Sequence, residues 1–120
     1  MAKAIVPGLD NSLKILGDPS RFAIFDLLMQ GVQCNCELGG LLKMPMNLIS
    51  HHLKVLHAAG LVNAKRDTQD ARWIYYSVNQ KAIVQLRGQV GDFLDPKRIQ
   101  PRQPACGPRV VSGKMIGARR

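Results

Sequence analysis

The sequence predicts a mainly α-helical domain that carries one β-hairpin. Apolar residues recur at helical spacing in segments spread between residues 9 and 94. One interruption, residues 61–78, consists of β-branched and aromatic runs around the turn-forming residues TQDA. The 120 residues suffice for one domain with a modest core. We expect it to span residues 1–95, followed by a flexible basic tail at 96–120, whose prolines, glycines and basic residues cannot form a packed core.

The first two predicted helices follow each other closely. Residues 9–16 place leucines on one side of a short helix. The next helix begins after Asp18, a good N-cap, has Pro19 at its first position and ends at Gly31. Arg21 has two possible roles, a phosphate contact or a structural contact, and we favour the structural one. The residues expected to reach the core from this helix are Phe22, Phe25, Leu28 and Met29.

Two further helices form a predicted helix-turn-helix. Residues 34–43 read CNCELGGLLK, with Leu38, Leu41 and Leu42 as expected core contacts. Pro45 follows almost at once and suits the first turn of a helix that runs to Ala59 and stops at Gly60. Because the connection is so short, the two helices form a helix-turn-helix.

The second of these helices has a face suited to a DNA major groove. Ile49, Leu53 and Leu56 share one side of it. The opposite side is polar and basic without a carboxylate, so it can donate to phosphates and base edges. The expected contact residues are Asn47, Ser50, His51 and Lys54, while His52, nearer the apolar side, is either a contact or partly buried. The alternative is an ordinary amphipathic surface helix.

The predicted hairpin places three cations near its tip: Lys65, Arg66 and Arg72. A basic ribbon directly after a helix-turn-helix is a wing, so the predicted fold is a winged helix-turn-helix that contacts DNA with both elements. The neighbouring aromatics, Trp73, Tyr75 and Tyr76, are expected to pack the hairpin rather than stack on bases. The last helix, residues 80–94, is amphipathic and needs a partner surface, which a second subunit would supply.

Charge and motifs exclude several functions. The net charge is +9, but residues 1–95 carry only +2 and residues 96–120 carry +7, so bulk charge is weak evidence for a specific DNA surface. No apolar run reaches the ~20 residues of a membrane span, and we expect a cytoplasmic protein. No catalytic motif predicts an enzyme; a thiol oxidoreductase would carry Cys-x-x-Cys beside a βαβ unit. A non-specific chromosome-binding protein remains an alternative and would bind with steep salt dependence.

These pieces together resemble the ArsR/SmtB family of metal-responsive repressors. The resemblance rests on GDPSRFAIFDLL, CNCEL, NLISHHLKVLHAAGLV and RWIYYSVN, which occur in the family's order between residues 10 and 80. It implies a homodimer built from the first and last helices, binding palindromic operator DNA with half-sites about one turn, ~34 Å, apart.

The resemblance also implies a metalloid site. Cys34 and Cys36 match the Cys-x-Cys of arsenic- and cadmium-sensing members; otherwise they are small buried apolar residues. Residues two apart do not share a helix face, so we expect the helix start to unwind when both bind one ion. We also expect the helix N-terminus to lower the pKa of the thiols. Binding would then strain the helix-turn-helix and release DNA.

The third ligand departs from the pattern of the arsenic-sensing members. Members with three cysteines carry the third near Gly39, which has no side chain here, so Cys106 in the tail is the candidate; otherwise it is a stray exposed cysteine. The family's zinc, nickel or cobalt site on the last helix is missing, because residues 80–95 hold no histidine. The predicted inducer is As(III) or Sb(III), since three thiolates suit trivalent arsenic. The alternatives are Cd(II) or Pb(II), or thiol oxidation.

Overall fold

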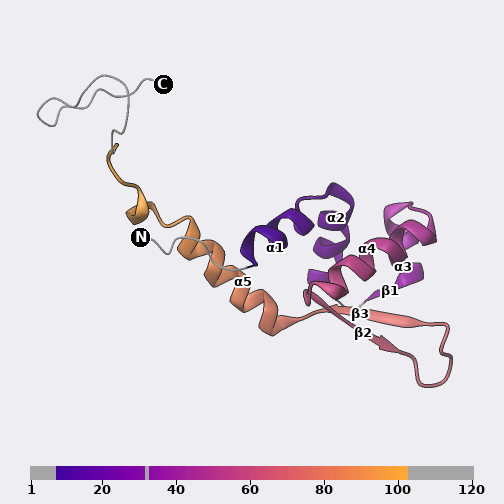
Figure 1. The fold of residues 1–120 in the computed structure, drawn as a ribbon. Coiled ribbons are helices and arrows are strands. Elements are labelled where there is room, and N and C mark those ends of the chain that lie inside the picture. The colour runs from indigo at the N-terminus through magenta and orange to yellow at the C-terminus, as the bar shows by residue number, and fades with distance from the viewer. Residues whose placement is uncertain (1–7, 32, 103–120) are drawn as a thin grey trace, which may run out of the picture.

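The computed structural model describes residues 8–31 and 33–102 of the chain. They form a helical body with a small sheet on one side (Figure 1). The elements are α1 (Leu9–Leu16), α2 (Pro19–Met29), β1 (Gln33–Cys34), α3 (Asn35–Leu42), α4 (Met46–Ala58), β2 (Val62–Arg66), β3 (Ile74–Val78), α5 (Gln80–Phe93) and the 3-10 turn η1 (Pro96–Arg98). The predicted winged helix-turn-helix is confirmed. Strand β1 was not expected.

The core lies between α2, α3, α4 and the base of the hairpin. Its fully buried side chains come from three helices: Ile24, Leu28, Leu38, Ile49, Leu53 and Leu56. The predicted apolar side of α4 is therefore confirmed. The expectation was wrong for Phe22, Met29 and Leu41, which are exposed. Helix α2 turns Ile24 and Leu28 inward, four residues apart on one face, and Phe22 falls outside that face.

Local caps fix the helix boundaries. The Asp18 carboxylate accepts the backbone N–H groups of Ser20 and Arg21 at 3.0 and 3.1 Å, so α2 begins as predicted. Pro45 is the N-cap of α4 rather than a member of its first turn. Lys43, between α3 and α4, has a φ of 54°, a left-handed conformation that is unusual for a residue with a Cβ.

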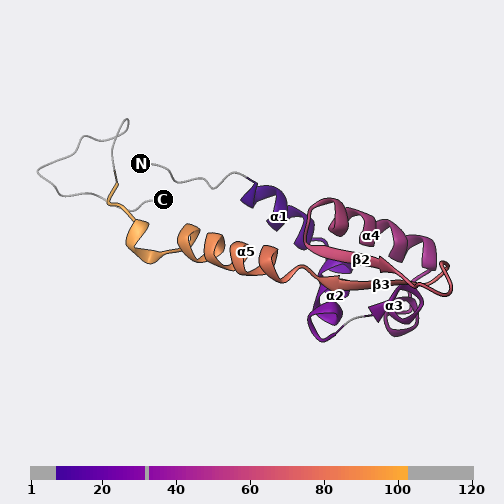
Figure 2. The same cartoon turned by 90° about the horizontal axis from the view of Figure 1, so that it is seen from below.

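The sheet has the order β1-β3-β2 within the described chain, and both pairings are antiparallel. Helix α5 leaves this body and extends away from it (Figures 1 and 2). None of the residues of α5 is buried, although Leu86 packs against the core. No helix in the described ranges is long and apolar enough to cross a membrane. The turn η1 lies at the start of the predicted tail, and Cys106 lies outside the described residues.

Candidate DNA-binding surface and thiol site

The polar face of α4 presents most of the predicted DNA contacts to solvent. Asn47, His51 and Lys54 are exposed and Ser50 is half-buried. They project from a helix whose other side is fixed in the core by Ile49, Leu53 and Leu56. A rigid helix with short polar side chains on its free face has the form of a major-groove reader.

His52 lies in the interior, against Arg21. Only 7% of its surface is exposed, and its Nδ1 lies 3.3 Å from Nη1 of Arg21. Arg21 also donates from Nε to the backbone carbonyl of Ile15, at 2.8 Å, and so connects the end of α1 to α4. Burial lowers the pKa of His52, and the nearby charges of Arg21 and His51 lower it further, against an opposing effect of Asp18. The structural role favoured for Arg21 is therefore the observed one, and the buried His52 is not placed to contact DNA.

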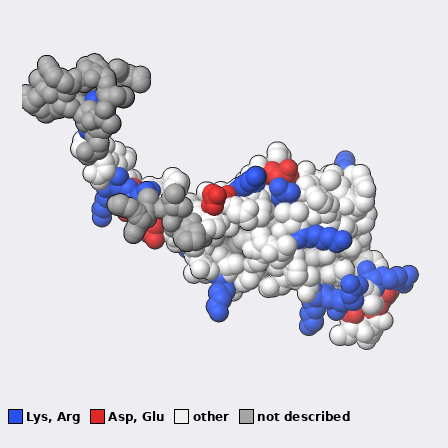
Figure 3. Space-filling model, in the orientation of Figure 1, with Lys and Arg blue, Asp and Glu red and all other residues white. Residues whose placement is uncertain are grey.

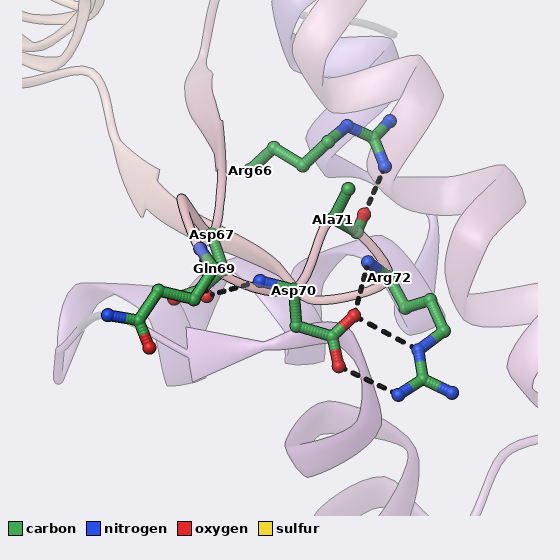
Figure 4. A network of polar contacts seen from close by, with 6 residues as sticks. All are labelled: Arg66, Asp67, Gln69, Asp70, Ala71 and Arg72. Carbon is green, nitrogen blue, oxygen red and sulfur yellow. Dashed lines mark hydrogen bonds and ion pairs between the residues drawn. The ribbon is translucent and has the colours of Figure 1, made fainter.

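Both arginines of the wing, Arg66 and Arg72, donate hydrogen bonds to acceptors within the wing loop (Figure 4). Arg72 donates from Nη2 and Nε to the two carboxylate oxygens of Asp70, at 2.8 and 3.0 Å. This pairing lowers the pKa of the Asp70 carboxyl. Arg66 donates to the backbone carbonyl of Ala71, and Asp67 accepts the N–H groups of Gln69 and Asp70. The arginines thus shape the loop in the free protein.

Lys65 is the wing cation that is directly available to a phosphate. Its side chain is exposed and makes no hydrogen bond or ion pair within residues 8–31 and 33–102. Figure 3 shows basic side chains gathered at the tip of the hairpin with acidic ones beside them. The Arg72–Asp70 pair is exposed, so solvent screening makes it weak, and a phosphate can replace the carboxylate at little cost. Trp73 and Tyr75 are partly exposed, whereas Tyr76 packs against the core.

The two cysteines of the Cys-x-Cys segment lie together at the junction of β1 and α3. The Sγ atoms of Cys34 and Cys36 are 2.9 Å apart. Cys34 is buried and is the N-cap of α3; its backbone N–H donates to the Glu37 carboxylate at 2.8 Å. Cys36, in the first turn, is half-buried. Two soft sulfur donors that converge in this way suit a soft metal ion or a trivalent metalloid.

Two expectations for these thiols were wrong. The helix start need not unwind, because Cys34 lies outside the helix in extended backbone, where its side chain already reaches Cys36. The pKa of Cys34 is not lowered: burial raises it, and the contact with the Cys36 thiol raises it further. The helix N-terminus therefore does not dominate this thiol's environment. A ligand must displace its proton, so binding is coupled to proton release.

The described residues supply only two ligands of the predicted three. They contain no cluster of three or more His, Cys, Asp or Glu residues that would hold a metal ion. A side chain at Gly39 would meet the methyl group of Met46 at 3.4 Å and the carbonyl of Met44 at 3.5 Å. The neighbours that the sequence did not reveal are Glu37 and Tyr75. Tyr75 pairs with Cys34 across the sheet through a two-residue strand, which is too short to leave a periodic signal.

The geometry defines a winged-helix DNA-binding protein with a thiol pair inside its helix-turn-helix. The family model described as bacterial regulatory protein, arsR family, matches residues 18–64, from the N-cap of α2 into β2. A Methanocaldococcus jannaschii protein named an uncharacterized HTH-type transcriptional regulator is 39% identical over 74 residues, which are 61% of this chain and 80% of that protein. This chain belongs to the ArsR family of transcriptional repressors, and proteins of this class are not enzymes.

Two curated relatives with more specific names are matched over a smaller part of their own length. An arsenical resistance operon repressor of Staphylococcus xylosus is 39% identical over 49% of this chain and 57% of its own length. A transcriptional repressor SmtB homolog of Synechocystis is 32% identical over 66% of this chain and 58% of its own length. A crystal structure described as a possible transcriptional regulator for arsenical resistance is 30% identical, with a TM-score of 0.62, over 71% of this chain and 85% of that one. The chain thus spans just over half the length of the first two of these relatives.

Proposed function

We propose that this protein is a homodimeric repressor of a metalloid-resistance operon that releases its operator when As(III) or Sb(III) binds its cysteine thiolates. The observation that carries the proposal is the 2.9 Å contact between Cys34 Sγ and Cys36 Sγ at the start of the helix-turn-helix. The names of the Staphylococcus relative and of the 30%-identical structure agree with this inducer class. Residues 1–95 form the regulatory domain in this proposal, and residues 96–120 form the basic tail.

The DNA contacts divide between two elements. Asn47, Ser50, His51 and Lys54 enter the major groove from α4, where side-chain contacts with base edges give specificity. Lys65 binds a phosphate of the DNA backbone from the wing. Arg66 and Arg72 also bind phosphates once these replace the loop oxygens that now accept their hydrogen bonds. Each cation that contacts a phosphate makes the slope of log binding constant against log salt concentration steeper by about one. The buried His52 is not one of the proposed DNA contacts.

The dimer is proposed from the apolar surface that one chain leaves uncovered. On α1, Leu13 is 42% exposed, on α5 Val84 is 64% exposed, and Leu94, the C-cap of α5, is 67% exposed. Helices α1 and α5 also contact each other within one chain. A second copy packing there would bury them and bring two α4 helices to one operator.

The inducer ligands are the two convergent thiols together with Cys106, proposed as the third sulfur for a trivalent centre. The thiols of Cys34 and Cys36 bind As(III) as thiolates and release their protons. Because Cys34 caps α3 and α3 packs on α4, a displacement at Cys34 reaches the recognition helix through that contact. Cys106 reaches the site from its own subunit or from the partner.

The test is fluorescence anisotropy of the reduced protein on labelled DNA from upstream of its own gene. Arsenite is titrated into the preformed complex, with Cys34→Ser and Cys106→Ser as separate variants. We expect release at near-stoichiometric arsenite, abolished by Cys34→Ser and strongly weakened by Cys106→Ser. Tight binding that arsenite leaves unchanged would refute the inducer. No preference for that DNA over random sequence would refute the operator assignment.

A second inducer class is supported by the same contact. Two thiols at 2.9 Å can ligate Cd(II) or Pb(II), or close a disulfide when a peroxide removes two electrons and both thiol protons leave. The anisotropy experiment separates these cases when cadmium, lead and hydrogen peroxide replace arsenite. Dithiothreitol reverses release by peroxide, and ethylenediaminetetraacetate reverses release by cadmium or lead.

A further inference from the structure

Three residues lie in one row across the small sheet. Strand β3 places Tyr75 opposite Cys34 of β1 on one side and opposite Lys65 of β2 on the other. Residues directly opposite each other in antiparallel strands point to the same face. Neighbouring strands are about 4.8 Å apart, so roughly 10 Å of sheet separates the Cys34 backbone from that of Lys65. Tyr75 is therefore the strand neighbour both of a cysteine of the thiol pair and of a cation of the wing.

Cys34 belongs to two structures at once, since it ends β1 and caps α3. Two sulfurs that ligate a tetrahedral ion at about 2.3 Å lie roughly 3.7 Å apart, and those of a pyramidal trivalent centre lie somewhat closer, so in either case the pair must open from its present separation of 2.9 Å. The first turn of α3 is fixed by the Glu37 contact and by Leu38, which is fully buried. Strand β1 has only two residues and both pair with β3, so a displacement of Cys34 would act directly on that pairing.

We propose that Tyr75 is a positioning residue through which the thiol pair acts on the wing. Ligand binding at Cys34 and Cys36 disturbs the pairing of Cys34 with Tyr75 and moves β3 together with the row that contains Lys65. The wing then loses its phosphate contact while α4 can remain folded. This inference rests on the proposed role of the thiols as the inducer site, and it adds a second route beside the contact of α3 with α4.

The chain contains a reporter at the right place. Trp73 is its single tryptophan and is 40% exposed. It precedes Tyr75 by two residues, and its backbone closes the wing loop by accepting from Asp67 N–H and donating to the Asp70 carbonyl, at 2.9 and 3.0 Å. Tryptophan emission and its quenching by acrylamide therefore report on the wing without an added label.

The experiment uses the reduced full chain without DNA, titrated with arsenite and separately with cadmium chloride. Occupied thiols are counted by the loss of free thiol, and Trp73 quenching by acrylamide is followed in parallel. We expect the quenching constant of the partly exposed Trp73 to change in step with thiol occupancy and to stay constant in Cys34→Ser.

Variants of Tyr75 separate coupling from folding. Tyr75→Ala should bind the same amount of arsenite, lose most of the Trp73 response and require several-fold more arsenite to release operator DNA. Tyr75→Phe, which keeps the ring between Cys34 and Lys65, should restore both responses. The matched control is Ser77→Ala, on the same face of β3 but opposite Asn63 rather than a cysteine, and it should behave as the unmodified chain.

Occupied thiols with an unchanged Trp73 signal would overturn the coupling, because release would then pass through α3 and α4 alone. A Tyr75→Ala variant with an undiminished Trp73 response would overturn it as well. If neither arsenite nor cadmium occupies Cys34 and Cys36, the proposed inducer site itself is wrong and the coupling falls with it. The free-thiol count distinguishes these failures.

Discussion

Replacement of Arg21 by glutamine should destabilise the fold by about 2 kcal/mol. The guanidinium of Arg21 makes two side-chain hydrogen bonds, to the Ile15 carbonyl and to the His52 ring. A hydrogen bond from a charged group contributes about 1.5–3 kcal/mol when buried, and the half-buried position of Arg21 reduces each to about 1 kcal/mol. Because the bonds join α1 to α4, their loss should also weaken operator binding several-fold.

Urea unfolding measures this effect, followed by far-UV circular dichroism at one fixed protein concentration, since the stability of the proposed dimer would depend on concentration. With a slope of about 2 kcal/mol/M, the midpoint should fall by about 1 M. Arg21→Lys can reach one acceptor and should recover about half of the loss. The control is Lys81→Gln, an exposed change at the start of α5, which should stay within about 0.5 kcal/mol. A loss for Arg21→Gln no larger than that of the control would refute the argument.

Three further predictions concern single positions. Because burial lowers the pKa of His52, the unfolded chain takes up this proton at a higher pH than the folded chain. The contribution of His52 to the free energy of unfolding should be complete above about pH 6.5 and be lost as the pH drops through the folded-state pKa. His52→Gln should flatten this part of a urea-unfolding pH series. Lys43→Gly should raise the free energy of unfolding by up to about 1 kcal/mol by removing left-handed strain; a lower urea midpoint would show that the lysine side chain contributes more. Gly39→Cys, whose Cβ would meet the movable end of Met46 at 3.4 Å and the Met44 carbonyl at an ordinary contact distance of 3.5 Å, should restore arsenite release in a Cys106→Ser background. Anisotropy that shows no release would mean that the thiol at position 39 does not reach the pair.

Local signals in the sequence were sufficient for the helices, the hairpin and the caps. Asp18 with Pro19, Gly60 after α4, and the change of period after it are nearest-neighbour features, and the structure places each as expected apart from the one-residue shift at Pro45. The inward face of α2 was harder to predict. Phe22 and Ile24 are both apolar, and only the packing of α2 against α3 and α4 turns Ile24 inward and leaves Phe22 outside.

The geometry of the candidate site could be predicted only in part. The Cys-x-Cys spacing identified the thiols, but a regular helix was the wrong reference, since Cys34 lies in β1 and pairs with Tyr75, 41 positions later in the chain. That pairing is a long-range contact without a local signature. The electrostatic expectation failed for a related reason: burial of Cys34 depends on residues that only the fold brings around it.

Asn79 fastens both ends of the hairpin at one point. Its backbone N–H donates to the Leu61 carbonyl at 2.9 Å and its side-chain amide donates to the Gly60 carbonyl at 3.0 Å. Because this end is held against the end of α4, a displacement of the ribbon would pivot about Asn79. At about 3.3 Å per residue, Tyr75 lies roughly 13 Å from the pivot and Asp70 about twice as far. A small displacement at Tyr75 would therefore about double at the tip of the wing, and the length of the ribbon sets this ratio.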